Sequence, residues 1–209
     1  MSGIFITFEG IEYCGKTTQS LLLIERLKEK GCDVVYTREP GGTNIGEDIR
    51  KILLDTRNST MNDLTEVLLY TASRVQHIHE VIQPALLKNK IVVCDRFMDA
   101  TIAYQGYARG LDMGLIYKLQ NMFIKNVTPN LTLLLDITPE QGLLRAANKR
   151  LDRIEKEDIE FHCMVRQGYL QIAEQEPDRV KVIDGSSDVD NVHQMICEYV
   201  DEIICNNGM

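Results

Sequence analysis

Ile4-Phe5-Ile6-Thr7-Phe8, followed after Glu9 by Gly10-Ile11-Glu12-Tyr13-Cys14-Gly15-Lys16-Thr17, is the stretch that decides the fold. The first run has the near-continuous apolar pattern of a buried strand. The second fits the pattern G-x-x-x-x-G-K-[ST] and leads into a helix-period segment. A strand, a Gly-rich loop and an amphipathic helix in this order indicate a loop that binds nucleotide phosphates. The alternative is a Gly-rich strand-to-helix turn with no ligand.

Each part of this loop has an expected task. The glycines let successive backbone N–H groups point at phosphate oxygens, and the following helix adds its positive N-terminal end. Lys16 is expected to reach the β- and γ-phosphates, and Thr17 to hold Mg²⁺. The residues expected to bind the nucleotide are Gly10, Ile11, Glu12, Tyr13, Cys14, Gly15, Lys16, Thr17 and Thr18.

Working outward, apolar runs alternate with helix-period segments. Strands are expected at 4–8, 91–94, 131–135 and 180–183, with a weaker one at 33–37. Helices are expected from Leu21 to a stop at Gly31, and over 64–87 with a break or kink near Pro84, 111–123, 140–147, 161–173 and 189–204. This alternation predicts an α/β fold, a doubly wound five-stranded parallel sheet flanked by helices. No repeat or linker divides the chain, so residues 1–209 are expected to form one domain.

The composition excludes some partners. A formal net charge of −8 disfavours nucleic acid and anionic membranes, and no basic patch compensates for it. Apolar runs fall far short of the roughly 20 residues that a bilayer-spanning helix needs. The six cysteines contain no C-x-x-C pair, which favours reduced thiols in a cytoplasmic protein.

A carboxylate and a guanidinium follow the apolar run at 91–94. In phosphate-loop enzymes, an acid at the end of such a strand organises the metal ion, so Asp95 joins Thr17 as a candidate Mg²⁺ ligand. A strand-end cap is the alternative for Asp95. Arg96 at a buried strand end indicates an anion nearby.

Five blocks of sequence resemble the bacterial thymidylate kinase family, in that family's order and nearly from end to end. They are Phe8-Glu9-Gly10-Ile11-Glu12, Thr37-Arg38-Glu39-Pro40-Gly41-Gly42-Thr43, Asp95-Arg96-Phe97, Ala103-Tyr104-Gln105-Gly106 and Leu151-Asp152-Arg153-Ile154-Glu155. The resemblance implies transfer of the γ-phosphoryl of ATP to dTMP with Mg²⁺, giving dTDP. It also implies a homodimer and a mobile lid, here at about 145–156.

The acceptor side of the site follows from the same resemblance. Arg74 and Arg96 match arginines that contact the phosphate and base, since guanidinium forks suit phosphate oxygens. Tyr70, one helical turn before Arg74, resembles the aromatic residue that stacks on thymine. An ordinary core aromatic is the alternative for Tyr70.

Further acceptor contacts are implied around the sugar. Thr101 and Tyr104 match the segment that closes over the deoxyribose, where Tyr104 would leave no room for a 2′-hydroxyl. Gln105 matches a position near the base. Glu12 resembles the acid that meets the 3′-hydroxyl or the metal. Arg38 is a weaker candidate, because an ion pair that stabilises its loop explains it equally well.

A basic cluster marks the expected lid. Arg145, Lys149, Arg150 and Arg153 concentrate positive charge in an acidic chain. Such a flap can neutralise the transferring phosphoryl group and exclude water. Arg153 is the leading candidate for this contact, with Arg145 and Arg150 beside it. The alternative is a solvated helix face balanced by the acids just downstream.

Two loop residues depart from the family pattern. Tyr13 and Cys14 stand where small residues are usual, and a non-glycine residue is strained at positive φ. A non-catalytic nucleotide-binding homologue is therefore one alternative function. Another deoxynucleotide or nucleoside kinase of the same architecture is the second.

Overall fold

The structure is a computed structural model that describes residues 3–124, 127–147 and 149–206. The described residues contain one sheet of five parallel strands in the order β2-β3-β1-β4-β5. The strands are β1 (Ile4–Glu9), β2 (Val34–Arg38), β3 (Ile91–Asp95), β4 (Leu131–Asp136) and β5 (Val180–Asp184). The predicted α/β class, strand number and parallel pairing are confirmed.

The central strand explains why the apolar runs are continuous. All six residues of β1 are buried, because β3 and β4 pair with it on either side and helices cover both faces. Alternate side chains enter different core clusters. Ile4, Ile6 and Phe8 pack with Leu23 and Leu27 of helix α1 (Lys16–Glu29). Phe5 packs instead with a cluster that includes Ile82 and Ala85.

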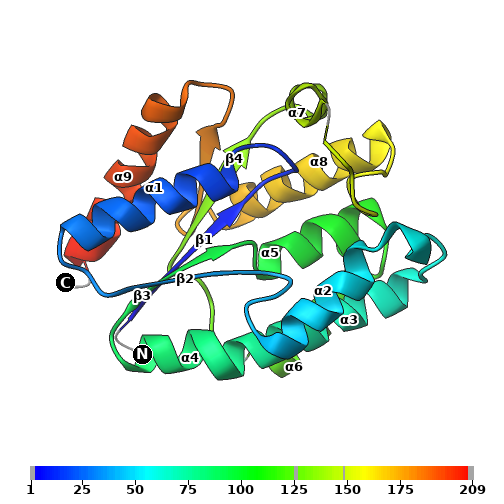
Figure 1. Ribbon diagram of the computed structural model, residues 1–209, viewed down its shortest axis with the longest axis horizontal. Helices are drawn as coiled ribbons and strands as arrows, with labels where there is room; N and C mark the ends of the chain where they lie inside the picture. Colours follow the sequence, from blue (N-terminus) through cyan, green and yellow to red (C-terminus); the bar gives the residue numbers. More distant parts are fainter. Residues whose placement is uncertain (1–2, 125–126, 148, 207–209) are drawn as a thin grey trace.

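Helices connect the strands and cover both sides of the sheet. Figure 1 shows α1 and α9 side by side on one side of the strands, and α4 with α6 on the other. The α-helices are α1 (Lys16–Glu29), α2 (Asn44–Leu54), α3 (Asp63–His77), α4 (Gln83–Leu87), α5 (Met98–Thr101), α6 (Met113–Phe123), α7 (Pro139–Ala146), α8 (Ile159–Gln175) and α9 (Val189–Asn206). A 3₁₀ turn, η1 (Thr56–Asn58), and two π-helical segments, η2 (Ile78–Ile82) and η3 (Ile102–Ala108), complete the helical elements.

The expected helix over 64–87 is an unbroken run of helical residues, but its backbone hydrogen-bond pattern changes along the run. It consists of α3, the π-helical η2 and α4, with Pro84 in the first turn of α4. Proline has no N–H to donate to the preceding turn, so the predicted break near Pro84 has a direct cause. Helix α2 and the pair α5–η3 were not predicted.

The order of strands creates the place where ligands can bind. The chain leaves β1 toward β2 and β3 on one side, and later returns to β4 on the other side of β1. Loops after neighbouring strands therefore diverge at the carboxyl end of β1. The Gly-rich loop follows β1, and Asp95 and Arg96 follow β3 beside it.

The predictions about membrane helices and about the cysteines can be compared with the structure. No helix among the described residues is long and apolar enough to cross a bilayer. The cysteines, all within the described residues, are unpaired.

Candidate active site

The loop after β1 has the backbone that its sequence predicts. Gly10 has a φ of 135°, and a Cβ there would lie 2.4 Å from the carbonyl oxygen of Leu135. Gly15, at φ 104°, caps helix α1. The Lys16 amino group donates to the carbonyl oxygens of Gly10 (3.1 Å) and Ile11 (2.8 Å) and is nearly buried against the loop.

Tyr13 and Cys14 fit this loop in different ways. Tyr13 has a φ of 61°, the left-handed conformation that glycine adopts with least strain. Its ring lies 4.7 Å from the Lys149 amino group, and burial together with the Glu155 carboxylate raises the pKa of its hydroxyl. Cys14 is buried, with its sulfur 3.5 Å from the Lys16 amino group. The loop therefore reaches its left-handed turn with a tyrosine in place.

A cavity of about 450 Å³ opens over this loop and runs to the ends of β2 and β3, a size that suits small ligands. Most candidate residues named from the sequence line it. They are Glu12, Tyr13, Gly15, Lys16, Thr17, Thr18, Arg38, Tyr70, Arg74, Asp95, Arg96, Thr101, Tyr104, Gln105 and Arg145. Gly10, Ile11, Cys14, Arg150 and Arg153 are not among its lining residues.

The two expected metal ligands meet at the cavity wall. The Thr17 hydroxyl donates to Oδ2 of Asp95 at 2.7 Å. Mg²⁺ usually takes one or two protein oxygens and completes its shell with water and substrate phosphates, so this pair fits it. Across the described ranges, no cluster of three or more His, Cys, Asp or Glu side chains offers a metal site made by protein alone.

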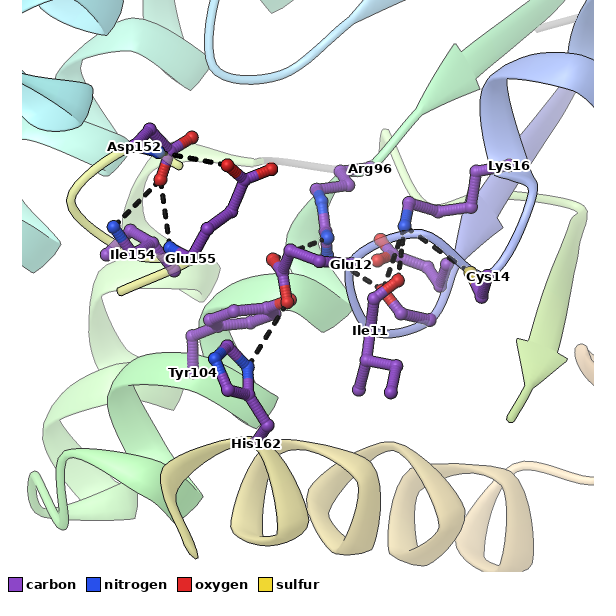
Figure 2. A network of polar contacts seen from close by, with 12 residues as sticks. Ile11, Glu12, Cys14, Lys16, Arg96, Tyr104, Asp152, Ile154, Glu155 and His162 are labelled. Atoms are coloured by element: carbon purple, nitrogen blue, oxygen red, sulfur yellow. Dashed lines mark hydrogen bonds and ion pairs between the residues drawn. The ribbon is translucent and has the colours of Figure 1, made fainter. Parts of the chain in front are cut away.

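Glu12 and Arg96 form an ion pair at the acceptor end of the loop (Figure 2). Nη2 of Arg96 donates to Oε1 of Glu12 at 2.9 Å, and the Tyr104 hydroxyl donates to the same oxygen at 2.5 Å. Burial alone would raise the pKa of Glu12, but Arg96, His162 and Lys16 together hold it well below its usual range. Glu12 is therefore a carboxylate at any working pH.

Arg74, on helix α3, is fixed by hydrogen bonds in the same way as Arg96. Its Nε donates to Oε2 of Glu39 at 2.6 Å, its Nη1 to the Thr101 hydroxyl and its Nη2 to the Phe97 carbonyl. Only 5% of the Arg74 side chain and 3% of the Glu39 side chain are exposed. Glu39 thus pairs with Arg74, whereas Arg38 forms its ion pair with Glu47 at 3.1 Å.

The remaining acceptor candidates also lie at the cavity. Tyr70, on α3, is half-buried and lines the wall with Arg74. Gln105 is buried and donates to Oε1 of Glu66 at 2.8 Å. The segment that carries Thr101, Tyr104 and Gln105 is α5–η3, so a helix places all three on one side of the cavity.

The lid arginines do not form one group. Arg145 reaches the loop, donating to the carbonyl oxygens of Tyr13 (3.3 Å) and Gly185 (2.9 Å). Arg150 is exposed and lies outside the cavity lining. Arg153 differs most from its expectation. It is buried, pairs with Glu66 at 2.6 Å and donates to the Leu53 carbonyl.

The structure thus places Arg153 away from the cavity, unlike the expected leading lid cation. In this conformation its guanidinium is held by the Leu53 carbonyl of α2 and by Glu66 of α3. Arg145 and Lys149 are the lid cations that line the cavity. Position 148, within the expected lid, lies outside the described residues.

Sequence reasoning missed three cavity residues of clear chemical interest. Arg50, on the unpredicted helix α2, lines the cavity beside Arg38, and burial followed by the charge of Arg38 lowers its pKa. Two crowded guanidinium groups indicate an anion site between them.

Asp152 and Glu155 also line the cavity in a tight turn (Figure 2), and burial raises the pKa of Asp152. The Thr43 N-cap was the signal that could have revealed α2.

The strand order, the position of the loop and the chemistry of the cavity define a P-loop protein of the nucleotide-binding α/β class. Comparison with known proteins narrows this class. The family profile described as Thymidylate kinase matches residues 8–196, and the chain belongs to the thymidylate kinase family.

Individual relatives agree with that assignment. A thymidylate kinase of Geotalea uraniireducens (strain Rf4) is 51% identical, over 93% of this chain and 94% of the relative. One from Geotalea daltonii is 53% identical, over 90% and 92%. The crystal structure of thymidylate kinase from Ehrlichia chaffeensis is similar with a TM-score of 0.78 and 38% identity, covering 95% of this chain and 98% of that one.

Proposed function

We propose that this protein transfers the γ-phosphoryl group of ATP to dTMP, giving dTDP and ADP. One observation carries the proposal: in a chain of the thymidylate kinase family, a single cavity joins the phosphate loop to the Glu12–Arg96–Tyr104 cluster. Donor and acceptor phosphates can therefore meet in one place. An oxygen of the dTMP phosphate attacks the γ-phosphorus, the bond to the bridging oxygen breaks, and ADP leaves.

The donor half of the cavity binds the ATP phosphates. Lys16 lines the cavity at the start of α1. Loop N–H groups and the positive end of α1 would face the phosphate oxygens, with Lys16 among them. Thr17 and Asp95 would hold Mg²⁺, which neutralises charge on the phosphates when it is bound. Arg145 and Lys149 add positive charge from the lid where charge spreads over the transferring oxygens.

The acceptor half binds dTMP through residues already ordered by one another. Arg96, with Arg38 and Arg50, supplies charge for the 5′-phosphate, while Arg74 and Gln105 face the base. Tyr70 offers its ring to thymine. Tyr104 lies beneath the sugar and Glu12 accepts a hydrogen bond from its 3′-hydroxyl.

A direct assay tests this function. Purified protein with Mg²⁺, dTMP and ATP labelled in the γ-phosphate is expected to yield labelled dTDP and unlabelled ADP. Labelled dTDP would exclude the non-catalytic alternative that Tyr13 and Cys14 raise. Nucleotide binding without labelled product would contradict the proposal, and faster labelling of dCMP, dAMP or thymidine would favour another kinase of this architecture.

The proposal includes a homodimer. Exposed apolar side chains recur along one side of α3, at Leu64, Leu68 and Val75, and α6 packs beside it with Tyr117 and Phe123 exposed. An apolar patch of this kind on neighbouring helices suits an isologous interface. Light scattering after gel filtration is expected to give twice the monomer mass for the native chain and the monomer mass for Leu68→Asp. A native monomer would contradict the dimer.

The remaining assignments concern context. The unpaired cysteines support a reducing, cytoplasmic location. The small molecules dTMP and ATP are the proposed partners, with no nucleic acid or membrane among them, and the chain acts as one domain with its lid at about 145–156.

Function and Mg²⁺ dependence are tested together when the labelling assay is repeated with excess chelator, which is expected to abolish product.

A further inference from the structure

Helix α8 directs two buried polar side chains toward the loop after β1. His162 and Tyr169 are seven residues apart, which is close to two helical turns, so they lie on one face. Their exposed fractions are 6% and 2%. Neither was singled out from the sequence as part of the site. Buried polar groups persist where they have a partner, so the partners show what the two side chains do.

Tyr169 connects Arg96 to a buried carboxylate. Its hydroxyl accepts from Nη1 of Arg96 at 3.0 Å and donates to Oε2 of Glu9 at 2.6 Å. Nη1 of Arg96 also donates to the Gly10 carbonyl, so the guanidinium is fixed to the loop. The Arg96 backbone has a φ of 71°, a strained conformation for arginine that its surroundings must hold.

His162 lies near Glu12, the carboxylate of the Glu12–Arg96 ion pair (Figure 2). Its Nδ1 lies 3.4 Å from Oε2 of Glu12. That oxygen is buried and has no hydrogen-bond partner, so the His162 contact at 3.4 Å is a charge contact, whereas Oε1 receives hydrogen bonds from both Arg96 and Tyr104. A buried carboxylate oxygen that lacks a hydrogen bond is costly, and the His162 ring, 3.4 Å away, is placed to stabilise it.

We propose that His162 and Tyr169 are positioning residues, which hold the Glu12–Arg96 pair in the orientation that receives dTMP. The inference rests on the proposed assignment of Glu12 and Arg96 to the acceptor. Neither positioning residue touches substrate. They lower the cost of binding because the acceptor meets side chains that are already oriented.

Tyr169→Phe isolates the hydroxyl, since the ring and its packing remain. The loss of one buried hydrogen bond to a charged group is expected to raise the KM for dTMP about tenfold, with kcat and the KM for ATP changed less than about threefold. Tyr199→Phe on α9 is the matched control and is expected to leave all three constants unchanged. A KM for dTMP equal to that of the control would overturn the proposal, whatever happens to thermal stability.

His162 permits a rescue test that does not depend on the fate of Tyr169→Phe. His162→Asn places an amide N–H near the position of Nδ1, and His162→Leu places none there. The asparagine variant is expected to keep a KM for dTMP within about threefold of native, and the leucine variant to raise it about tenfold. Equal KM values for these two variants would overturn the role of His162.

Arg96→Ala separates this inference from the function on which it rests. If Arg96→Ala leaves the KM for dTMP unchanged, the acceptor assignment itself fails. If Arg96→Ala raises it strongly while Tyr169→Phe and His162→Leu do not, the acceptor assignment stands and the positioning role is overturned.

Discussion

The two halves of the cavity hold their cations differently. On the acceptor side, Arg74 is buried in an ion pair with Glu39, and Arg96 is largely enclosed in an ion pair with Glu12, with 17% of its side chain exposed. On the lid side, Arg145 and Lys149 are exposed, and they contact backbone carbonyl oxygens and the ring of Tyr13. Cations held in buried ion pairs are already oriented for a ligand, and breaking such a pair lowers the stability of the fold. Exposed cations can move with a lid.

This difference suggests a division of work. Under the proposed assignment, the acceptor half would present an already ordered surface to dTMP, so changes there should affect the KM for dTMP and folding together. The lid half would contribute charge when the phosphoryl group is in transfer, so changes there should affect kcat. Each substitution below tests or sharpens that division.

The largest effect is expected at the loop lysine. Lys16→Ala removes the amino group nearest the expected β- and γ-phosphates and should lower kcat by about 10² or more. Steady-state ADP release with saturating ATP and dTMP measures this. Lys28→Ala, an exposed lysine on the same helix, serves as control. Near-native turnover of Lys16→Ala would contradict the assignment of the loop.

Arg74→Ala should show how firmly the acceptor side is built. It leaves Glu39 buried without its guanidinium partner, so the free energy of unfolding should fall by about 3–5 kcal/mol. The KM for dTMP should rise in whatever fraction remains folded. Urea denaturation measures the first effect, with exposed Arg57→Ala as control. If both variants were equally stable, Arg74 would not be preorganised by Glu39.

Glu9 gives the acceptor side a pH dependence. Burial, and then the charge of Asp99, raises the pKa of Glu9 from its usual 4.5 to about 7. Between these values the folded chain keeps a proton that the unfolded chain has released. The free energy of unfolding therefore falls as pH rises through this window.

Glu9→Gln should remove that part of the slope. Urea denaturation at pH 5 and pH 8 is expected to show a smaller loss of stability for Glu9→Gln than for the native chain. Glu25→Gln, exposed on α1, should keep the native slope. Identical slopes for native and Glu9→Gln would show that Glu9 is ionised in both states across this range.

A smaller effect is expected at the sugar, in the discrimination between dTMP and its ribose analogue. Tyr104 is buried beneath the proposed sugar position and is held by Glu12. The ribose analogue of dTMP adds a 2′-hydroxyl there and should lose roughly 10- to 100-fold in kcat/KM, as for a displaced or unpaired polar group. Equal kcat/KM for the two acceptors would remove Tyr104 from this role.

The fold was predictable because its signals are local. Continuous apolar runs predicted four of the strands, a weaker pattern at 33–37 predicted the fifth, and the loop pattern located Lys16 and Thr17. Helix α2 was missed because the Pro40-Gly41-Gly42 segment before it indicated a loop. Its start depends on the Thr43 side chain accepting from the Gly46 N–H, a cap that was not weighed.

The site was less predictable because its contacts are distant in sequence. Arg153 belongs to a basic cluster, but its partner Glu66 lies on α3, which no local pattern reveals. His162 and Tyr169 read as an ordinary helix face, and only the packing of α8 beside the loop gives them polar partners. Tertiary structure thus decides which members of a charged cluster line the cavity.

The division between the two halves is tested most directly by kcat and thermal stability for Arg145→Ala, Arg150→Ala and Arg153→Ala. Arg145→Ala should lower kcat roughly tenfold with stability and the KM for dTMP unchanged, since Lys149 remains beside it. Arg150→Ala should match the native chain, and Arg153→Ala should lose stability because Glu66 is left without one of its buried partners. A lower kcat at full stability in Arg153→Ala or Arg150→Ala, with Arg145→Ala unaffected, would contradict the account.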